Sequence, residues 1–417
     1  MDTTVILTAG IITLATLLLW LTEWLPLYAT TMGLIVAIAV FLGGSHLEFG
    51  LAQVLGWSAN PILALFFGGF ALSVAAQKYQ LDSFICAALL RGSGNNQNRL
   101  VLNILLGTAF LSMWISNIAA AAMMLVALKP TLSHDQPHLR KALLLAVALG
   151  ANLGGMATPI GTGPNGIAIA VLAQKNSISF VQWMSFALPL TLGLLALAYG
   201  LLRLIYRFKG QLPAKKISQP ALSKQAWKLL AIFGATLLLW LLEPWHGISA
   251  AVIAAASAFA LFASRLLSKE DLTKIDWGTL FLIAGGITLG TLIERSGLAQ
   301  WVNSLIPWHQ FSKTAVSFVL IFSCALLSAL ASNTAAAALV IELGRQIDPS
   351  PTLTILIALG ASLGIPFVIS TPPNAMVYGQ GGIKLRDFLV PGLILMLLGS
   401  LALTFTGEFF LRVFLGG

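Results

Sequence analysis

The sequence predicts an all-α polytopic membrane protein with about ten transmembrane helices and two re-entrant helical hairpins. Only 9% of its 417 residues are charged, whereas soluble domains carry about 25%. Hydrophobic residues make up 58% of the chain, and the mean hydropathy is +0.91. Polar side chains must cover the surface of a soluble globule. A soluble enzyme, a nucleic-acid-binding protein and a disordered regulator are therefore excluded.

The spans follow from the lengths of the apolar runs, because about 20 residues cross the hydrocarbon of a bilayer. Ten runs are predicted spans: 4–22, 28–44, 60–77, 138–174, 180–207, 226–242, 247–264, 277–294, 352–382 and 386–414. Two more apolar stretches, 100–128 and 313–345, each hold a Ser-Asn pair near the middle. Each is too long for one helix and too short for two spans. We therefore expect these stretches to form the hairpins.

Basic residues predict the orientation, because cytoplasmic loops of membrane proteins are enriched in Lys and Arg. With the N-terminus outside, eighteen of the 23 basic residues fall on the cytoplasmic side and five outside. Both termini are then expected on the outer face of a bacterial-type inner (plasma) membrane. The basic segment 208–225 is expected to be a cytoplasmic linker that contacts anionic membrane lipid rather than nucleic acid.

Short motifs recur in the same order in both halves of the chain. The pairs are Trp20–Glu23 with Trp240–Glu243, Gly68–Gly69 with Gly285–Gly286, Ser116–Asn117 with Ser332–Asn333, Ala148–Gly150 with Ala358–Gly360, and Thr162–Asn165 with Thr371–Asn374. Their offsets fall slowly from 220 to 209 residues. Such self-similarity indicates an internal repeat.

The two repeats are expected at 1–207 and 226–417, joined by the linker 208–225. The first would hold scaffold helices 4–77, hairpin 100–128, broken helix 138–174 and helix 180–207. The second would hold scaffold helices 226–294, hairpin 313–345, broken helix 352–382 and helix 386–414. Each unit has five spans, an odd number, so the second copy enters the membrane inverted. Inverted repeats with broken helices are typical of secondary transporters.

The polar breaks carry the candidate chemistry. Each half has a hairpin tip, 112–118 or 328–334, and a Gly/Pro-rich break, 154–165 or 364–374. Helix N-termini at such breaks attract anions, while carbonyl, hydroxyl and amide oxygens suit Na⁺. No charged residue occurs in 100–128, 142–174, 314–341 or 349–383. Because proton-driven transporters keep an ionisable group at their site, Na⁺ coupling is favoured. Glu342 is expected to anchor the membrane interface.

At these motifs the chain resembles the divalent anion:sodium symporter (DASS) family. The carrying residues are Trp20–Leu27, Ser332–Thr334 and Pro372–Asn374. The resemblance covers nearly the whole chain. It implies a homodimer with a fixed scaffold and a mobile transport domain that carries a small anion across by an elevator-like shift. Substrates in this family include succinate-like dicarboxylates, tricarboxylates and sulfate.

The resemblance also implies the site residues. One Na⁺ site would use Ser112, Ser116, Asn117 and Gly161, and the other Ser328, Ala331, Asn333 and Ser370. The anion would contact Ser116, Asn117, Ile118, Ser332, Asn333, Thr334, Pro164 and Pro373. Na⁺ is the expected coupling ion, with no organic cofactor.

Two residues depart from the family pattern: Ile118 replaces a threonine and Gly163 replaces a proline. Loss of a hydroxyl from a site that hydrogen-bonds its substrate alters selectivity. The expected function is Na⁺-coupled symport of a C4-dicarboxylate such as succinate. The alternatives are transport of sulfate or another oxyanion, dicarboxylate exchange, and arsenite or Na⁺/H⁺ antiport. The chain has no HExxH or GxSxG motif, which disfavours a membrane enzyme.

Overall fold

The computed structural model describes residues 3–22, 24–44, 46–94, 96–129, 131–132, 136–173, 178–210 and 221–415. Glu23 and residues 211–220 of the predicted linker lie outside this part of the chain. Within it, all regular secondary structure is helical, with no strand.

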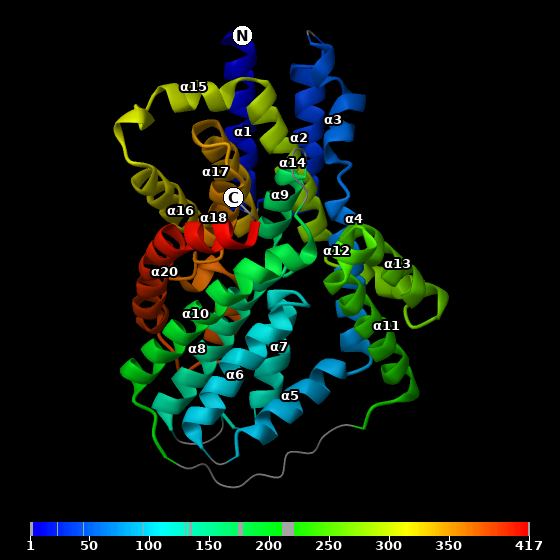
Figure 1. Ribbon diagram of the computed structural model, residues 1–417, viewed down its shortest axis with the longest axis vertical. Coiled ribbons are helices and arrows are strands. Elements are labelled where there is room, and N and C mark those ends of the chain that lie inside the picture. The colour runs from blue at the N-terminus through cyan, green and yellow to red at the C-terminus, as the bar shows by residue number, and fades with distance from the viewer. Residues whose placement is uncertain are drawn as a thin grey trace.

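The chain folds into long apolar helices together with several shorter ones (Figure 1). The first half contains α1 (Thr3–Thr22), α2 (Leu27–Phe41), α3 (Leu51–Ser58), α4 (Ile62–Lys78), α5 (Leu81–Gly92), α6 (Gln97–Ser112), α7 (Asn117–Leu128), α8 (Pro137–Gly154), α9 (Gly163–Leu172) and α10 (Phe180–Tyr206). The second contains α11 (Lys224–Leu241), α12 (Glu243–His246), α13 (Ala250–Ala263), α14 (Trp277–Arg295), α15 (Leu298–Ser304), α16 (Lys313–Leu330), α17 (Asn333–Ile347), α18 (Pro351–Ala361), α19 (Pro372–Gly379) and α20 (Leu385–Leu415). Short 3₁₀ turns are η1 (Leu47–Phe49), η2 (Gly155–Ala157), η3 (Lys269–Lys274), η4 (Trp308–Gln310) and η5 (Val368–Ser370).

The eight unbroken predicted spans each coincide with one helix: α1, α2, α4, α10, α11, α13, α14 and α20. Among the described residues, six helices are long and apolar enough to cross a membrane, or seven if the α3–α4 pair, bent by 48°, forms one span. Helices α2 and α13 have only 15 and 14 residues. The chain is therefore polytopic, and the count of ten spans stays a prediction.

The predicted hairpins and breaks coincide with interruptions of the helices. Helices α6 and α7 meet at the Ser116–Asn117 tip, and α16 and α17 meet at the Ser332–Asn333 tip. Turn η2 interrupts 138–174 between α8 and α9, and η5 interrupts 352–382 between α18 and α19. Glycine and proline in these breaks end the hydrogen-bond ladder of the helix.

Of the four short helices that the sequence does not predict, α3, α5, α12 and α15, the pair α5 and α15 occupies equivalent places in the two halves. Each follows a long helix and precedes a hairpin. They have 12 and 7 residues, too few to span a bilayer, so a search for long apolar runs passes over them. Figure 1 shows α5 and α15 at opposite ends of the molecule.

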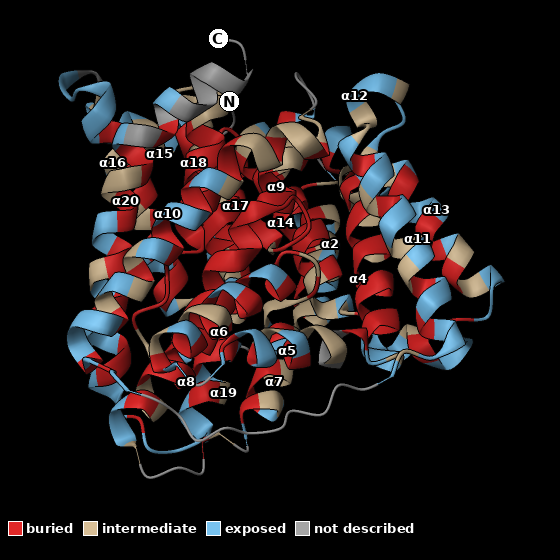
Figure 2. Cartoon of the chain, turned by 60° about the horizontal axis from the view of Figure 1, so that its bottom comes forward, coloured by how far each residue is buried: buried red, intermediate tan, exposed pale blue. Residues whose placement is uncertain are grey.

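Helix α8 lies in the centre, and every residue from Ala142 to Gly154 is buried. A side chain at Gly154 would collide with the Ala109 backbone of α6, so glycine permits close packing of the two helices. Figure 2 shows buried residues gathered in the middle of the molecule and exposed ones on the outer helices. The first break is therefore buried in the protein, where non-helical backbone is tolerated. In the second break Ser370 is buried, while Ile369 is 82% exposed and lines a cavity.

Buried apolar side chains form three clusters that divide the molecule. The largest draws on α5–α10 and α16–α20. The second is built mainly from α4, α11, α13 and α14, and the third mainly from α1, α2, α14 and α15. The hairpins and broken helices thus share one core with α10 and α20, while α1–α4, α11 and α13–α15 pack mainly in two others.

Candidate functional site

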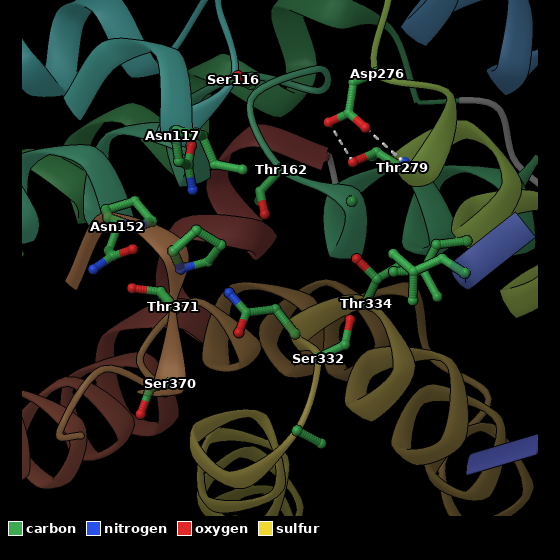
Figure 3. A pocket seen from close by; sticks show the side chains of 18 of the residues that line it. Ser116, Asn117, Asn152, Thr162, Asp276, Thr279, Ser332, Thr334, Ser370 and Thr371 are labelled. Atoms are coloured by element: carbon green, nitrogen blue, oxygen red, sulfur yellow. Dashed lines mark hydrogen bonds between the residues drawn. The ribbon is translucent and has the colours of Figure 1, made fainter. Parts of the chain in front are cut away.

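A cavity of about 640 Å³ lies where the two hairpin tips meet the two breaks. Figure 3 shows Ser116 and Asn117 on one side, Ser332 and Thr334 on the other, and Thr162 between them. The lining residues, which combine polar tips with an apolar wall, are Trp20, Thr22, Leu27, Phe66, Phe70, Ser116, Asn117, Ile118, Asn152, Ile160, Gly161, Thr162, Gly163, Asp276, Thr279, Leu282, Leu330, Ala331, Ser332, Asn333, Thr334, Ile369, Ser370, Thr371, Pro372, Pro373 and Ala375.

Besides α2, which begins at the lining residue Leu27, four helices of the hairpins and breaks begin at this cavity. Their first residues, Asn117 of α7, Gly163 of α9, Asn333 of α17 and Pro372 of α19, all line it. A helix N-terminus presents free N–H groups and a partial charge of about +0.5. Among the described lining residues there is no Lys, Arg or His, and Asp276 is the one charged side chain. Positive potential in the cavity therefore comes from the backbone.

The first tip holds a compact group of oxygen atoms. The Ser112 hydroxyl oxygen lies 2.5 Å from Asn117 Oδ1 and 2.6 Å from the Ala151 carbonyl oxygen. A hydroxyl group has one proton, so it can donate to only one of these two acceptors at a time. Ser112 is fully buried. With Asn117 Oδ1 in this position, three oxygen atoms would share a single proton.

The Asn117 amide can meet this group of oxygen atoms in two orientations. As placed, its oxygen faces only acceptors, and with oxygen and nitrogen exchanged the amide would donate to Ser112 Oγ at 2.5 Å, to Gly161 O at 3.2 Å and to Ala151 O at 3.3 Å. The tip, the end of α8 and the first break therefore direct oxygen atoms at one point. Such a set satisfies itself either by flipping the amide or by binding a cation.

The second tip repeats the pattern with the equivalent residues. The Ser328 hydroxyl oxygen lies 2.6 Å from Asn333 Oδ1 and 2.5 Å from the Ala361 carbonyl oxygen. Ser370 Oγ donates to the Ala329 carbonyl at 2.9 Å. Ala331 ends α16 in an extended conformation and lines the cavity. Again a buried serine hydroxyl serves two acceptors from different elements.

One asparagine holds each break in shape. Asn165 Nδ2 donates to the carbonyls of Gly155 at 3.0 Å and Thr158 at 2.8 Å. In the second half, Asn374 Nδ2 donates to the carbonyl oxygens of Ile365 at 3.0 Å and Phe367 at 2.8 Å. Both asparagines are buried. These bonds satisfy carbonyls that the broken helices release, so each break has a defined conformation.

A direct bond joins the two halves beside the cavity. Asn152 Nδ2 on α8 donates to Asn374 Oδ1 on α19 at 2.9 Å. Asn152 lines the cavity and is only 3% exposed. The two breaks, more than 200 positions apart in sequence, thus form a single site.

The chain shares its sequence pattern with a known family of proteins. Residues 17–351 match a family model described as "Citrate transporter". The chain belongs to this citrate-transporter family. It is therefore an integral membrane transporter and not an enzyme, which also agrees with the resemblance to the DASS family.

Several individual proteins are similar to this family member over most of its length. An uncharacterized transporter of Haemophilus influenzae is 31% identical, covering 94% of this chain and 89% of its own. An uncharacterized transporter of Methanocaldococcus jannaschii is 32% identical, covering 93% and 90%. The sodium-dependent dicarboxylate transporter SdcS of Staphylococcus saprophyticus is 28% identical, covering 95% and 84%.

One solved structure shares the fold of this citrate-transporter family member. The crystal structure of the Alcanivorax borkumensis YdaH transporter, described as having an unusual topology, superimposes with a TM-score of 0.61 at 16% identity. The match covers 97% of this chain and 98% of that one. At this identity the similarity concerns the fold alone.

The residues predicted to bind the anion and Na⁺ fall into two groups, those that line the cavity and those that do not. Most of those expected to contact the anion line the cavity: Ser116, Asn117, Ile118, Ser332, Asn333, Thr334 and Pro373. Pro164 is buried and does not line the cavity. Of the expected Na⁺ ligands, Gly161, Ala331 and Ser370 also line the cavity, while Ser112 and Ser328 are buried at its edge.

Sequence reasoning missed one wall of the site. Asp276 and Thr279 line the cavity at the start of α14, far from either tip in sequence. Asp276 Oδ1 accepts from Thr279 N at 2.9 Å, and Oδ2 accepts from Thr279 Oγ1 at 2.7 Å. An Asp followed by an apolar run signals a helix N-cap. That signal locates the helix start but not the cavity that this start faces.

Proposed function

We propose that this transporter couples the uptake of a small divalent anion, such as the C4-dicarboxylate succinate, to Na⁺. The observation that carries the proposal is the convergence of four helix N-termini on a cavity without a basic side chain among its described lining residues. N–H groups at the starts of α7, α9 and α17 can bind carboxylate or sulfate oxygens. Helix α19 begins with Pro372 and Pro373, which have no N–H group, so it contributes only its dipole. An anion held only by partial charges gains further from a cation bound beside it.

Two cation sites complete the proposal. Ser112, Ser116, Asn117 and Gly161 would hold one Na⁺, and Ser328, Ala331, Asn333 and Ser370 the other. Hydroxyl, amide and carbonyl oxygens are hard neutral ligands that suit Na⁺. In the first cluster the Asn117 amide lies against Ser112 Oγ, Ala151 O and Gly161 O, and in the second the Ser328 hydroxyl lies within 2.6 Å of two acceptor oxygens. A cation at this point would relieve the competition for one proton.

Charge balance favours a dianion. Two Na⁺ ions neutralise a dicarboxylate or sulfate, so the loaded cavity would carry no net charge apart from Asp276. The relatives named as sodium-dependent dicarboxylate transporters support the same cargo. Ile118, which is 45% exposed and lines the cavity, presents an aliphatic surface where Thr334 presents a hydroxyl at the other tip. The family description makes citrate a further substrate to test.

The fold suggests how the cargo would move. The hairpins and broken helices share one apolar core, and α1–α4, α11 and α13–α15 build the others. This division fits a transport domain that shifts against a scaffold as an elevator. Two inverted repeats with ten spans and two re-entrant hairpins would form each subunit of a homodimer.

The orientation follows from the charges. Thr22, Leu27, Asp276 and Thr279 line the cavity at the ends of α1, α2 and α14. The positive-inside rule places these ends in the cytoplasm and both termini outside. The cavity would therefore open inward across the inner membrane in this conformation.

Reconstitution into proteoliposomes tests the proposal. Uptake of labelled succinate, citrate and sulfate would be compared with and without an inward Na⁺ gradient. We expect Na⁺-dependent uptake of succinate, abolished by Asn117→Ala and by Asn333→Ala. Uptake of every substrate at the same rate without Na⁺ would refute the symport.

A matched control separates site effects from folding. Asn103 lies on α6 outside the cavity and donates to the Leu89 carbonyl at 3.2 Å and to Ser93 Oγ at 3.0 Å. Asn103→Ala removes the same amide and should leave the Na⁺ dependence of uptake unchanged. Normal transport by both tip variants would show that the cavity tips do not bind the cargo.

A further inference from the structure

A charged cluster lies at the end of α14 opposite the cavity. Helix α14 runs from Trp277, beside the cavity residue Asp276, to Arg295. Near that far end, Arg345 Nη1 of α17 lies 3.1 Å from Glu342 Oε2 and 3.7 Å from Glu294 Oε2 of α14. Helices α14 and α17 lie side by side in Figures 1 and 2. The cluster therefore bridges the hairpin and the helix on which it packs.

Glu342 is the buried member of this cluster. It is 2% exposed, so it does not anchor a membrane interface as the sequence suggested. Its Oε1 has no hydrogen-bond partner among the described residues. A Cβ atom at Gly290 would lie 3.8 Å from Glu342 Oε2, so the carboxyl group packs directly on α14. An ionised carboxylate with an unpartnered oxygen is costly to bury.

The surroundings offer Glu342 little compensation. A small cavity is lined by Ile167, Ala170, Val171, Gly286, Ile287, Gly290, Thr291, Glu294, Ala338, Glu342 and Arg345. The contribution of α9 is wholly apolar. On α14, Thr291 Oγ1 already donates to the Ile287 carbonyl at 2.8 Å, and Glu294 carries the same charge as Glu342. On α17 itself, the side chains of Arg345 and Gln346 both hydrogen-bond with the Glu342 carboxyl group.

Charge and space point to a proton as the ligand. Arg345 is shared between the buried Glu342 at 3.1 Å and Glu294, whose side chain is 38% exposed, at 3.7 Å, so the charge of the buried carboxylate is only partly compensated. The pocket admits about 10 Å³ of water-sized volume, which is at the lower limit for one water molecule. A hydrated cation does not fit, and the described side chains supply too few free oxygens to replace its water shell.

We propose that Glu342 binds a proton while α17 is packed on α14 and releases it when the two helices separate. The inference rests on the proposed shift of the hairpin domain against the scaffold. The proton is not cargo of the substrate cavity, because Glu342 lies at the opposite end of α14. Instead, the proton couples pH to the contact between α14 and α17, which we call the seal.

The sign of the coupling follows from linkage. In the packed state the neutral carboxyl group is favoured, whereas in the separated state water stabilises the carboxylate. Low pH therefore favours the packed conformation and rising pH favours separation. For a single proton, the ratio of separated to packed molecules can rise by at most about tenfold per pH unit.

Accessibility of a cysteine in the seal measures this ratio. Ala338 of α17 is 2% exposed and lines the small cavity. Ala338→Cys would be made in a chain carrying Cys86→Ala and Cys324→Ala, and the protein placed in nanodiscs. Maleimide labelling is then followed from pH 6 to pH 8. Ser249→Cys, at an exposed loop position, corrects for the pH dependence of the thiol reaction.

The corrected labelling rate should rise with pH, by up to about tenfold per unit. Glu342→Gln, which remains neutral, should hold the rate low at every pH. Glu48→Gln removes an exposed carboxylate elsewhere and should keep the full pH dependence. If Ala338→Cys is labelled at a rate that does not change with pH, the proton site alone is refuted. No labelling at any pH would refute the domain shift and the proton site together, and succinate uptake would still report on the cargo independently.

Discussion

Gly163, the first residue of α9, lies directly against Thr334, near the start of α17. A Cβ atom at Gly163 would meet the Oγ1, Cγ2 and Cβ atoms of Thr334. The break of the first half thus touches the hairpin tip of the second half. At the equivalent position the second half has Pro372, so glycine makes room here for the threonine hydroxyl at the cavity.

We expect Gly163→Ala to impair transport more than folding. The added methyl group must displace Thr334, and overpacking of this kind costs about 1–3 kcal/mol. Both helix N-termini at the cavity would shift. Gly193→Ala is the control, because a Cβ atom there meets open space. Thermal unfolding and uptake would be measured together, and equal uptake by the two variants would contradict a tight fit at Gly163.

The sequence predicted the breaks well and their partners poorly. Glycine, proline and repeated Ser-Asn pairs located both tips and both interruptions, because these residues end helices wherever they occur in an apolar run. The partners of the tips are set by tertiary packing. That Gly163 meets Thr334, and that Asn152 donates to Asn374, depends on how two distant segments cross, which no local pattern records.

Removal of either buried serine hydroxyl should weaken Na⁺ binding. Ser112→Ala and Ser328→Ala each take one ligand from a proposed Na⁺ site while leaving the other site intact. The Na⁺ concentration for half-maximal uptake should rise about tenfold, equivalent to about 1.4 kcal/mol. With one site weakened, the Hill coefficient for Na⁺ should fall from about 2 toward 1.

Thr108→Val is the matched control for these serine variants. Thr108 is buried on α6, and its hydroxyl donates to the Ile104 carbonyl at 2.7 Å outside the cavity lining. Its loss removes a hydroxyl group from the same helix as Ser112. Unchanged Na⁺ activation in Ser112→Ala and Ser328→Ala would contradict the assignment of both clusters as Na⁺ sites.

Ile118 should limit affinity for a carboxylate. Ile118→Thr restores a hydroxyl donor at the first tip, matching Thr334 at the second. One added hydrogen bond contributes about 1 kcal/mol, so half-maximal uptake of succinate should need about fivefold less substrate. Valine has the shape of threonine without the hydroxyl group, so Ile118→Val should show no gain in affinity for succinate. Equal affinities of the Thr and Val variants would mean that this position does not contact the anion.

Charged residues beside the site show a second limit of sequence reasoning. The charge-free stretches coincide with the cavity tips, as expected, but Glu342 lies one position beyond the stretch 314–341. A residue just past a charge-free window looks like an interface anchor, and only the packing of α17 on α14 buries it. Asp276 was missed for the same reason, since its capping pattern does not reveal the cavity beside it.

A buried carboxylate also joins α4 to η3 away from the site. Asp271 in η3 is 3% exposed and lies 2.6 Å from Lys78 Nζ at the end of α4 and 3.0 Å from Lys274 Nζ. Burial would raise the pKa of Asp271, but hydrogen bonds from Lys78 and from the Ser268 backbone N–H outweigh it and hold this pKa well below its usual range. The ionised form therefore stabilises the fold.

Asp271 makes the stability of the scaffold dependent on acid. A carboxyl group whose pKa is lower in the folded chain contributes stability above its unfolded pKa, near 4, and loses it as the pH falls toward the folded value. Asp271→Asn should lower the free energy of unfolding by about 1–3 kcal/mol at pH 7, and the difference from wild type should shrink below about pH 4. Glu270→Gln changes the exposed neighbour and should have little effect at either pH. Thermal unfolding in nanodiscs at pH 7 and pH 3.5 measures both variants, and a deficit of Asp271→Asn that is equal at the two values would contradict the lowered pKa.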